Sequence, residues 1–482
     1  MRVLEQLEPK NVLSFFEDLC AIPHGSGNTK AISDYCVKFA ESRGLEVHQD
    51  GLNNVVIVKP ATPGYEAAPT VIVQGHLDMV TEKTPESTIN FLTDGLELEV
   101  DGDFIRAKGT TLGGDDGIAV AMALAVLDAK DLSHPRLECL FTIDEETGMD
   151  GAVGFDASIL QGKRLLNIDS EEEGILTVSC AGGAHAAVRI PMTANECALD
   201  SAEIRISGLK GGHSGAEIDK GRANATITLG RVLQALVDEL EVRLVSAEGG
   251  LKDNAIPNAA RAVIALEDGK LPRAQEICAE LQDTFRREYA AADPDVTVTF
   301  TPGTVASQAL TLRDTKKVCC FLGLYPNGIE SMSMDIPGLV QTSCNLGIFK
   351  VNGSGLEGSG SVRSSIASRK QLLLRRIGLL AEGLDGTLCV SGEYPAWEYR
   401  RESHLRDVMC KVYKDQYGQD MKVEAIHAGL ECGLFCGKIP GLDAVSFGPN
   451  LYDIHTVKEH MSISSVQRVY AYLCAVLQVL KD

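Results

Sequence analysis

Four short segments of the sequence carry side chains of the kinds that bind divalent metal ions. They are His76-Leu-Asp78, Leu112-Gly-Gly-Asp-Asp-Gly117, Phe141-Thr-Ile-Asp-Glu-Glu-Thr-Gly148 and Asn167-Ile-Asp169. Imidazole nitrogen and carboxylate oxygen are both ordinary zinc ligands, and a carboxylate that uses both oxygens can bridge two ions. In an extended segment, residues i and i+2 project to the same side, so His76 and Asp78 can enter one site. These residue types and spacings indicate a metal centre.

Each segment also has a simpler interpretation. Asp115 and Asp116 begin a predicted helix, where carboxylates commonly cap the chain and interact with the helix dipole. The three acids at 144–146 suit the surface, as we predict for the similar run at 171–173. If the acids at 144–146 are buried at a strand end instead, they repel one another unless a cation lies among them. A lone His-x-Asp is weak evidence by itself.

The elements that position these segments follow from apolar runs bounded by turn residues. Such runs predict buried strands at 55–58, 71–74, 137–143 and 165–168. We expect a helix from Asn28, as its cap, to about Arg43, and an Ala/Leu-rich helix over 118–130. This alternation predicts an α/β domain with a largely buried sheet. The candidate ligands fall at strand ends, where α/β sheets bind their ligands.

The pattern changes at about residue 186. Strand 203–207, helix 223–240, strands 242–246 and 261–266, helix 272–289 and strand 296–300 follow one another. This β-α-β-β-α-β order is typical of the ferredoxin-like arrangement. A partial second copy is predicted within 301–390, with strands 341–351, 359–364 and 387–391 and helix 370–381.

After about residue 391 the first pattern returns. Helix 403–417, strands 423–426 and 444–447, and a final helix from about 464 complete the chain. We therefore predict an α/β protein in which residues 1–185 and 391–482 form a split catalytic domain with a mostly parallel sheet. Residues 186–390 form an inserted, duplicated ferredoxin-like lid domain.

Composition excludes several classes of function. The net charge of −22, with no block of Lys or Arg, argues against nucleic acid as a partner. No apolar run reaches the roughly 18 residues of a membrane span, and residues 1–10 lack a signal peptide's apolar stretch, so we expect a cytoplasmic protein without a membrane partner. The 14 cysteines are scattered and contain no CxxC pair, which favours reduced thiols over disulfides. Cys432 and Cys436 share a helix face, but a metal pair there is not favoured.

The order of the motifs along the chain resembles the M20 metallopeptidase family, and the match to its aminoacyl-histidine (Xaa-His) dipeptidase branch spans essentially the whole chain. The matching motifs are Gln74-Gly-His-Leu-Asp-Met79, Thr110-Thr-Leu-Gly-Gly-Asp-Asp-Gly117, Asp144-Glu-Glu-Thr-Gly-Met149, Gly211-Gly-His-Ser-Gly215, His427-Ala-Gly-Leu-Glu-Cys-Gly433 and Gly448-Pro-Asn-Leu-Tyr-Asp-Ile-His-Thr456.

The resemblance implies a role for each candidate residue at a centre with two divalent ions. Zinc is the expected ion, with cobalt and manganese as alternatives. The metal ligands it implies are His76, Asp115, Glu146, Asp169 and His455, with Asp115 as the bridge. Asp78 would orient His76, and Glu145 would be the general base. The acidic neighbour Asp116 leaves open which member of the doublet bridges, and His460 competes with His455 without a comparable motif.

The resemblance also implies four substrate contacts from the later part of the chain: His213, Asn254, Arg363 and the backbone near Gly429. His213 would stabilise the developing oxyanion, and Arg363 would bind the C-terminal carboxylate. The predicted function is hydrolysis of small dipeptides, including Xaa-His such as β-Ala-His. A tripeptide aminopeptidase or related M20 amidohydrolase is the alternative, and a catalytically silent peptide-binding protein is the alternative from another class. The sequence leaves open whether the protein forms a homodimer.

Overall fold

The computed structural model describes residues 2–481, and the chain divides into two compact units. The first unit consists of Met1–Ser179, Tyr399–Ala425 and Leu430–Asp482. The second consists of Cys180–Glu398 and the short segment Ile426–Gly429. One long segment of chain, together with four residues from much later in the sequence, therefore builds the second unit.

The first unit is built on an eight-stranded sheet. Its strands run in the order β1 (Glu46–Gln49), β2 (Val55–Lys59), β6 (Leu137–Thr142), β3 (Val71–His76), β7 (Arg164–Asn167), β22 (Asp443–Ser446), β8 (Ile175–Cys180) and β21 (Lys422–Ile426). The central strands β6, β3, β7 and β22 pair in parallel, and antiparallel pairs extend the sheet through β2 and β1 on one side and β8 on the other. The parallel strands therefore end at one common edge.

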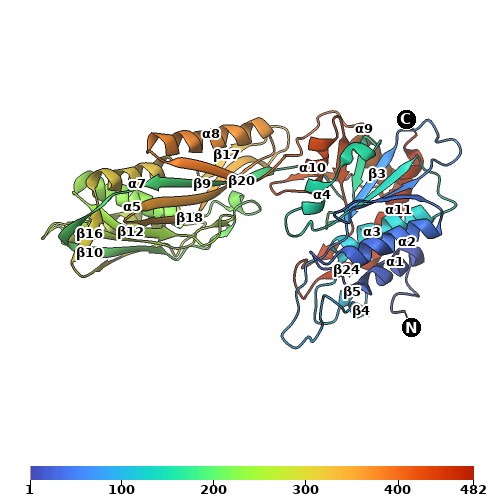
Figure 1. Ribbon diagram of the computed structural model, residues 1–482, viewed down its shortest axis with the longest axis horizontal. Helices are drawn as coiled ribbons and strands as arrows, with labels where there is room; N and C mark the ends of the chain where they lie inside the picture. The colour runs from blue at the N-terminus through green and yellow to red at the C-terminus, as the bar shows by residue number, and fades with distance from the viewer. Residues whose placement is uncertain (1, 482) are drawn as a thin grey trace. The chain divides into compact units, whose positions relative to one another are not determined.

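Seven helices of the described chain belong to this unit: α1 (Lys10–Cys20), α2 (Lys30–Ser42), α3 (Gly114–Asp128), α4 (Asp150–Gly154), α9 (His404–Tyr417), α10 (Glu431–Lys438) and α11 (Ile463–Val479). Figure 1 shows α1, α2 and α3 lying together beside the sheet. Every residue of β3 and β6 is buried, as the apolar runs predicted. The prediction that Asn28 caps α2 is wrong: Thr29 occupies that position, and the Asn28 amide donates to the Phe91 and Leu92 carbonyls.

A small four-stranded sheet completes the first unit. It has the order β23 (Leu451–Tyr452), β24 (His460–Ser462), β5 (Phe104–Ala107) and β4 (Leu98–Asp101). The loop between β23 and β24 carries His455. Pairing of β24 with β5 therefore anchors a loop from the end of the chain to a segment some 350 residues earlier.

The second unit contains a continuous antiparallel sheet whose first half is ferredoxin-like in order. The elements β10 (Ala194–Ser207), α5 (Ala225–Glu239), β12 (Arg243–Gly249), β14 (Ala260–Leu266), α6 (Leu271–Glu288) and β15 (Thr297–Pro302) follow one another. In space the strands lie in the order β15, β10, β14, β12. The last strand thus pairs with the first, and the third lies between the first and the second.

The second half of the sheet repeats the ferredoxin-like order, but it uses one strand from outside the second copy predicted within residues 301–390. It contains α7 (Leu312–Leu324), β18 (Val340–Asn352), β19 (Gly355–Ser364), α8 (Ala367–Gly383) and β20 (Thr387–Tyr394). The strand order β20, β9, β19, β18 places β9 (Gly182–Pro191) where the first strand of the copy belongs. Antiparallel pairing of β12 with β18 joins the halves.

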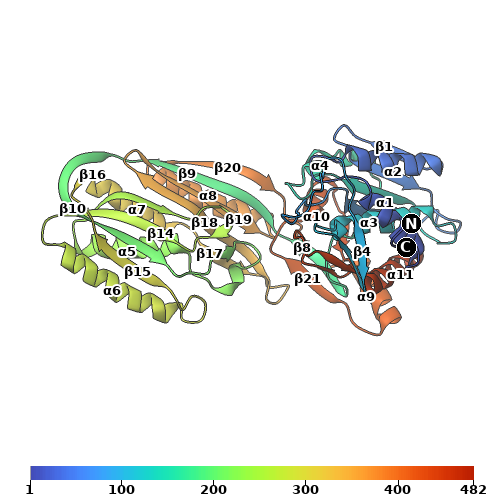
Figure 2. The same ribbon diagram turned by 90° about the horizontal axis from the view of Figure 1, so that it is seen from below.

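The two faces of this sheet differ. Helices α6, α5, α7 and α8 contact one another in that order, and Figures 1 and 2 show them as a layer along the sheet. The apolar core of the unit lies between this layer and the strands, and includes Ile204, Leu229, Leu346 and Phe349. Alternate residues, such as Arg205 and Arg261, are exposed on the opposite face, as the two-residue period of a strand requires. Among residues 2–481, no helix is long and apolar enough to cross a membrane.

Close packing of β3 against α3 generates a prediction about Gly75. A Cβ atom at Gly75 would lie 2.6 Å from Asp116 Oδ2 and 2.7 Å from Ala119 Cβ. We expect Gly75→Ala to lower the free energy of unfolding by about 1–3 kcal/mol, as overpacking does, and to weaken metal binding by displacing His76. Thermal unfolding and metal titration measure both effects. Gly51→Ala is the matched control, because its Cβ meets no atom within 4 Å. Equal stability of the two variants would contradict the packing argument.

Candidate metal centre

The parallel edge of the first unit brings the predicted metal ligands together. His76 is the last residue of β3, Glu145 and Glu146 follow β6, and Asp169 follows β7. Because β3 pairs in parallel with both β6 and β7, these three strand ends are neighbours. Asp115 lies at the start of α3.

The Asp115 carboxylate lies between two imidazoles. Its Oδ1 is 3.2 Å from His76 Nε2, and its Oδ2 is 3.1 Å from His455 Nε2. The same nitrogen of His455 is 3.0 Å from Glu146 Oε2, and His76 Nε2 is 3.9 Å from Asp169 Oδ1. The five predicted ligands therefore form one connected cluster with Asp115 at its centre.

Two subsets of this cluster have the spacing of a metal-binding group. His76, Asp115 and Glu146 form one, and His76, Asp116 and Asp169 form the other, with ligand atoms within 4.8 Å of one another in each. Nitrogen and carboxylate donors of this kind suit zinc and similar divalent ions. The donor set fits a pair of ions.

The two members of the acidic doublet face different partners. Both have non-helical backbone angles, so the regular part of α3 begins after them. Both oxygens of Asp115 face imidazole nitrogens, whereas Asp116 Oδ2 accepts the backbone N–H of His76 at 3.1 Å. Among the hydrogen bonds of the described residues, neither carboxylate caps α3. Helix capping therefore does not account for the doublet.

Asp78 connects the ends of β3 and β6. Its carboxylate accepts the backbone N–H groups of Glu145 and Glu146 at 3.0 and 3.3 Å, and the Ser26 hydroxyl at 2.8 Å. Oδ1 lies 3.5 Å from His76 Nδ1, which also faces the Asp78 carbonyl oxygen at 3.0 Å. These contacts set the orientation of the His76 ring.

The carboxylates of the cluster differ sharply in acidity. Burial, reinforced by repulsion from Glu146 and Asp115, raises the pKa of Glu145 to about 7. Burial also raises the pKa of Asp116 and of Asp169 well above their ordinary values. Although burial acts in the opposite direction, hydrogen bonds to His455 and His76 lower the pKa of Asp115. A carboxyl with a pKa near neutrality can accept and return a proton.

Two buried acids support the cluster, and neither was assigned a role from the sequence. Glu459 accepts backbone N–H groups of Leu112, Gly113 and Gly114 at 2.7, 3.1 and 2.8 Å, and so holds the loop that leads to Asp115. Glu431 accepts from Gln74 Nε2 at 2.6 Å and from the Thr142 hydroxyl at 2.7 Å, and so links β3 to β6. Glu431 belongs to the motif His427-Ala-Gly-Leu-Glu-Cys-Gly433, which was a sequence signal for it, whereas none of the matching motifs contains Glu459.

His460 lies away from the cluster. Its ring stacks on Tyr452 at 5.0 Å and meets the edge of Phe104 at 5.0 Å, and its Nδ1 faces the Lys458 carbonyl oxygen. His455 is the histidine of this segment that faces Asp115.

The second unit gathers another set of predicted residues around Gly215. A Cβ atom there would lie 3.1 Å from His213 Cε1, 3.1 Å from Arg363 Nε and 2.8 Å from the His427 carbonyl oxygen. Arg363 Nη1 donates to the Tyr394 hydroxyl at 2.9 Å. A Cβ atom at Gly429 would lie 2.8 Å from the same tyrosine ring.

The protonation of His213 follows from its surroundings. Its Nδ1 accepts the backbone N–H groups of Gly215 and Ala216 at 3.3 and 3.0 Å. Burial and the nearby Arg363 lower its pKa, so the ring is neutral with its proton on Nε2. His213 is therefore a neutral N–H donor.

Asn254, predicted as a further contact, accepts the Ser214 N–H with its backbone carbonyl oxygen at 2.9 Å and keeps its side chain exposed.

The α/β fold and its cluster of histidines and carboxylates at parallel strand ends define a metal-dependent hydrolase. The sequence pattern that describes Peptidase family M20/M25/M40 matches residues 72–479. The chain belongs to this family, and the family resemblance predicted from the motifs is confirmed.

Two similar proteins cover the whole chain. The cytosol non-specific dipeptidase of Escherichia coli (strain K12) is 34% identical over 480 residues, which are 99% of each chain. The crystal structure of aminoacylhistidine dipeptidase from Vibrio alginolyticus has a TM-score of 0.95 and 35% identity, over 98% of this chain and 97% of that one. Aminopeptidase PepT from Bacillus cereus shares the fold alone, with a TM-score of 0.56 and 16% identity over 99% of this chain and 100% of that one.

The electrostatics of the cluster predict how stability depends on pH without metal. Burial raises the pKa of Glu145 to about 7 and of Glu431 to about 8, and hydrogen bonds to Asp115 and Glu146 raise that of His455 to about 10. Each group holds its proton in the folded state to a higher pH than in the unfolded state. The stability that these groups contribute is thus greatest at low pH, and it is lost as the pH rises through their folded-state pKa values of about 7, 8 and 10.

We expect the melting temperature of chelator-treated protein to fall by several degrees between about pH 6 and about pH 8. With zinc bound, the fall should be smaller, because ions replace protons as the neutralising charge. Thermal unfolding followed by circular dichroism at both pH values measures the difference. Equal slopes with and without metal would contradict this account of the cluster.

Proposed function

We propose that the protein is a metal-dependent dipeptidase that hydrolyses free dipeptides, Xaa-His dipeptides among them. The observation that carries the proposal is the Asp115 carboxylate, whose two oxygens face His76 and His455 at 3.2 and 3.1 Å. The names of the two full-length relatives, a non-specific dipeptidase and an aminoacylhistidine dipeptidase, support the substrate class. The cytosolic name of one relative supports a cytoplasmic location.

In this proposal, Asp115 would hold both of two divalent ions. His76 and Asp169 complete one site, and Glu146 and His455 complete the other. The ions, zinc or else cobalt or manganese, would supply a Lewis acid for the scissile carbonyl and would lower the pKa of the attacking water. The contacts of Asp115 with both imidazoles favour it over Asp116 as the bridge.

Glu145 is the general base. Its pKa of about 7, raised by burial, lets it take a proton from the attacking water at neutral pH and deliver it to the leaving amine. Asp78 acts as a positioning residue, because it holds the backbone of Glu145 and the ring of His76 at once.

The second unit supplies the substrate contacts. The Nε2–H of His213 donates to the carbonyl oxygen as that oxygen gains negative charge. Arg363 binds the C-terminal carboxylate in a planar fork, the Gly429 backbone contributes to the same end, and Asn254 donates from its exposed amide. Residues 180–398, which carry most of these groups, would act as the lid.

The role of Glu145 is tested by Glu145→Gln, which removes a proton carrier and keeps the shape of the side chain. We expect kcat to fall by about 10²–10⁴ with two ions still bound. Elemental analysis and steady-state kinetics on Ala-His measure both quantities. The exposed Glu172→Gln is the matched control. Exhaustive chelation should abolish wild-type turnover, and zinc, cobalt or manganese should restore it.

Two results would count against this assignment. If Glu145→Gln loses metal in proportion to activity, Glu145 is a ligand and Glu146 is the candidate base. If the metal-free wild-type protein turns over normally, the metal centre has no catalytic role. A metal-loaded wild type that binds dipeptides without turnover would identify a peptide-binding protein instead.

Substrate length tests the carboxylate clamp. We expect kcat/KM for Ala-His and β-Ala-His to exceed that for the C-terminal amide by well over tenfold, because loss of a buried charged partner commonly costs about 2–5 kcal/mol. In Arg363→Gln the preference for the free acid over the amide should disappear, whereas exposed Arg369→Gln should keep it. Equal rates on dipeptides and on tripeptides extended at either end would favour a tripeptide aminopeptidase.

A further inference from the structure

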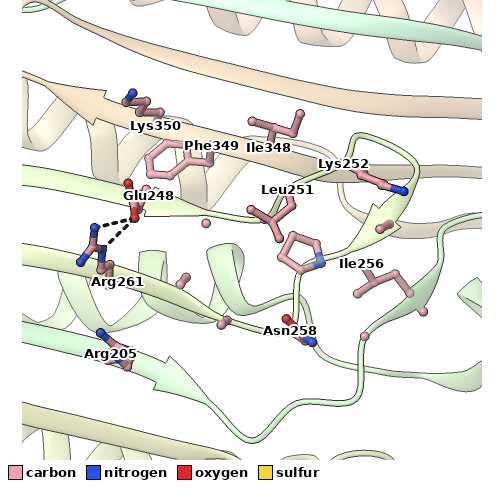
Figure 3. A pocket seen from close by; sticks show the side chains of 18 of the residues that line it. Arg205, Glu248, Leu251, Lys252, Ile256, Asn258, Arg261, Ile348, Phe349 and Lys350 are labelled. Carbon is pink, nitrogen blue, oxygen red and sulfur yellow. Dashed lines mark hydrogen bonds and ion pairs between the residues drawn. The ribbon is translucent and has the colours of Figure 1, made fainter.

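A second candidate binding site lies wholly within the second unit. It is a groove of about 780 Å³ on the sheet face that carries exposed side chains, between strands β10, β14, β12 and β18 (Figure 3). This volume is within the range of pockets that hold small ligands. None of its lining residues belongs to the metal cluster or to the Arg363 site.

The groove is cationic in a protein of net charge −22. Five basic side chains and a single acidic one line it: Arg205, Lys210, Lys252, Arg261, Lys350 and Glu248. The arginines have acidic partners, since Arg261 pairs with Glu248 at 2.8 Å and Arg205 with Glu203 at 3.3 Å. Across residues 2–481, no acidic side chain pairs with any of the three lysines, and all three are exposed. Glu248 and Glu357 are the cross-strand neighbours of Lys350 without forming an ion pair with it, and the basic lining residues still outnumber the acidic one. An excess of positive charge in a concave surface attracts anions.

The groove also offers an apolar contact. Leu251 is one of the lining residues and is 95% exposed; Figure 3 labels it together with Ile256 and Ile348. Pro257 and Ile348 also line the groove. An exposed leucine among unpaired lysines suits a ligand that combines negative charge with an apolar group.

The chemistry of the walls favours a peptide over a nucleotide. Phe349 is the one aromatic lining residue, and its ring is buried in the core at 1% exposure. No aromatic face is therefore available in the groove for a base to stack on. The glycine backbone at 211–212 and 249–250 also lines the groove.

We propose that this groove binds short acidic peptides that carry an apolar side chain, with the acidic groups contacting Lys210, Lys252 and Lys350. The site is distinct from the proposed dipeptide site, and binding does not depend on the proposed function.

The groove is connected to the loops that carry two proposed substrate contacts. Gly211 and Gly212 line it directly before His213, and Leu251 and Lys252 line it shortly before Asn254. Strands β11 (Gly212–His213) and β13 (Ala255–Ile256) pair with each other, which joins the two loops. A peptide in the groove therefore alters the position of His213. This coupling, unlike the binding itself, rests on the proposed function.

Binding is tested on the full-length, zinc-loaded protein by calorimetry with an acetylated and amidated Glu-Leu-Glu-Glu peptide. Its blocked ends keep it from acting as a free dipeptide. We expect it to bind at least tenfold more tightly than the Gln-Leu-Gln-Gln analogue, and more weakly as salt rises. The combined variant Lys210→Glu, Lys252→Glu, Lys350→Glu should lose at least tenfold in affinity. Exposed Lys316→Glu, on helix α7, is the control for a single charge reversal outside the groove, and each of the three groove lysines is also reversed singly for comparison with it. Circular dichroism verifies folding.

Several outcomes would overturn the proposal. Equal binding of the glutamine analogue, or undiminished binding by the folded triple variant, would remove the groove as an acidic-peptide site. Binding of inorganic tripolyphosphate in preference to the peptide would assign the groove to phosphates instead. Saturating peptide should change kcat/KM for Ala-His in the wild type and not in the triple variant. No change despite measured binding would refute the coupling, and peptide binding by a protein without dipeptidase activity would refute the proposed function alone.

Discussion

Mutual repulsion among closely spaced carboxylates is the constraint that the first unit has to satisfy around its candidate metal centre. Asp115, Asp116, Glu145 and Asp169 converge at the edge of a parallel sheet, and burial raises the pKa of three of them. Like charges this close cannot all ionise in a low-dielectric site unless cations neutralise them. Two imidazoles in contact with Asp115 supply part of that neutralisation, and divalent ions supply the rest in the proposed enzyme. Hydrogen bonds from the surrounding segments hold the backbone that carries these groups.

That support comes from hydrogen bonds between segments far apart in the chain. Glu459 binds the N–H groups before Asp115, although 344 residues separate the two acids. Glu431 binds side chains of β3 and β6 from the start of α10, and Asp78 binds the backbone that carries Glu145. Each of these acids satisfies donors that would be costly to bury alone. The ligand geometry is therefore a property of the sheet and of the C-terminal segment together.

The second unit is organised by repetition, because the ferredoxin-like strand order occurs twice in a single sheet. Helices cover one face, and the other face keeps charged side chains, including the lysines of the groove. The loops between these strands present His213 with its acceptor nitrogen already occupied by backbone N–H groups. The donor nitrogen is thereby free for a substrate oxygen. A backbone loop, not a second side chain, determines which nitrogen of this histidine carries the proton.

The sequence by itself determined the local elements and the types of the candidate ligands. Apolar runs predicted β3, β6 and β7. His76 ends β3, Glu146 follows β6 and Asp169 follows β7, at positions that parallel pairing must bring together. The motifs were also sufficient for the family. Only the tertiary structure decided which acid of the 115–116 doublet faces both imidazoles, that Glu459 holds the preceding loop, and that β9 completes the second ferredoxin-like half. These features depend on contacts between residues from 39 to 347 positions apart, and such contacts leave no periodic signal along the chain.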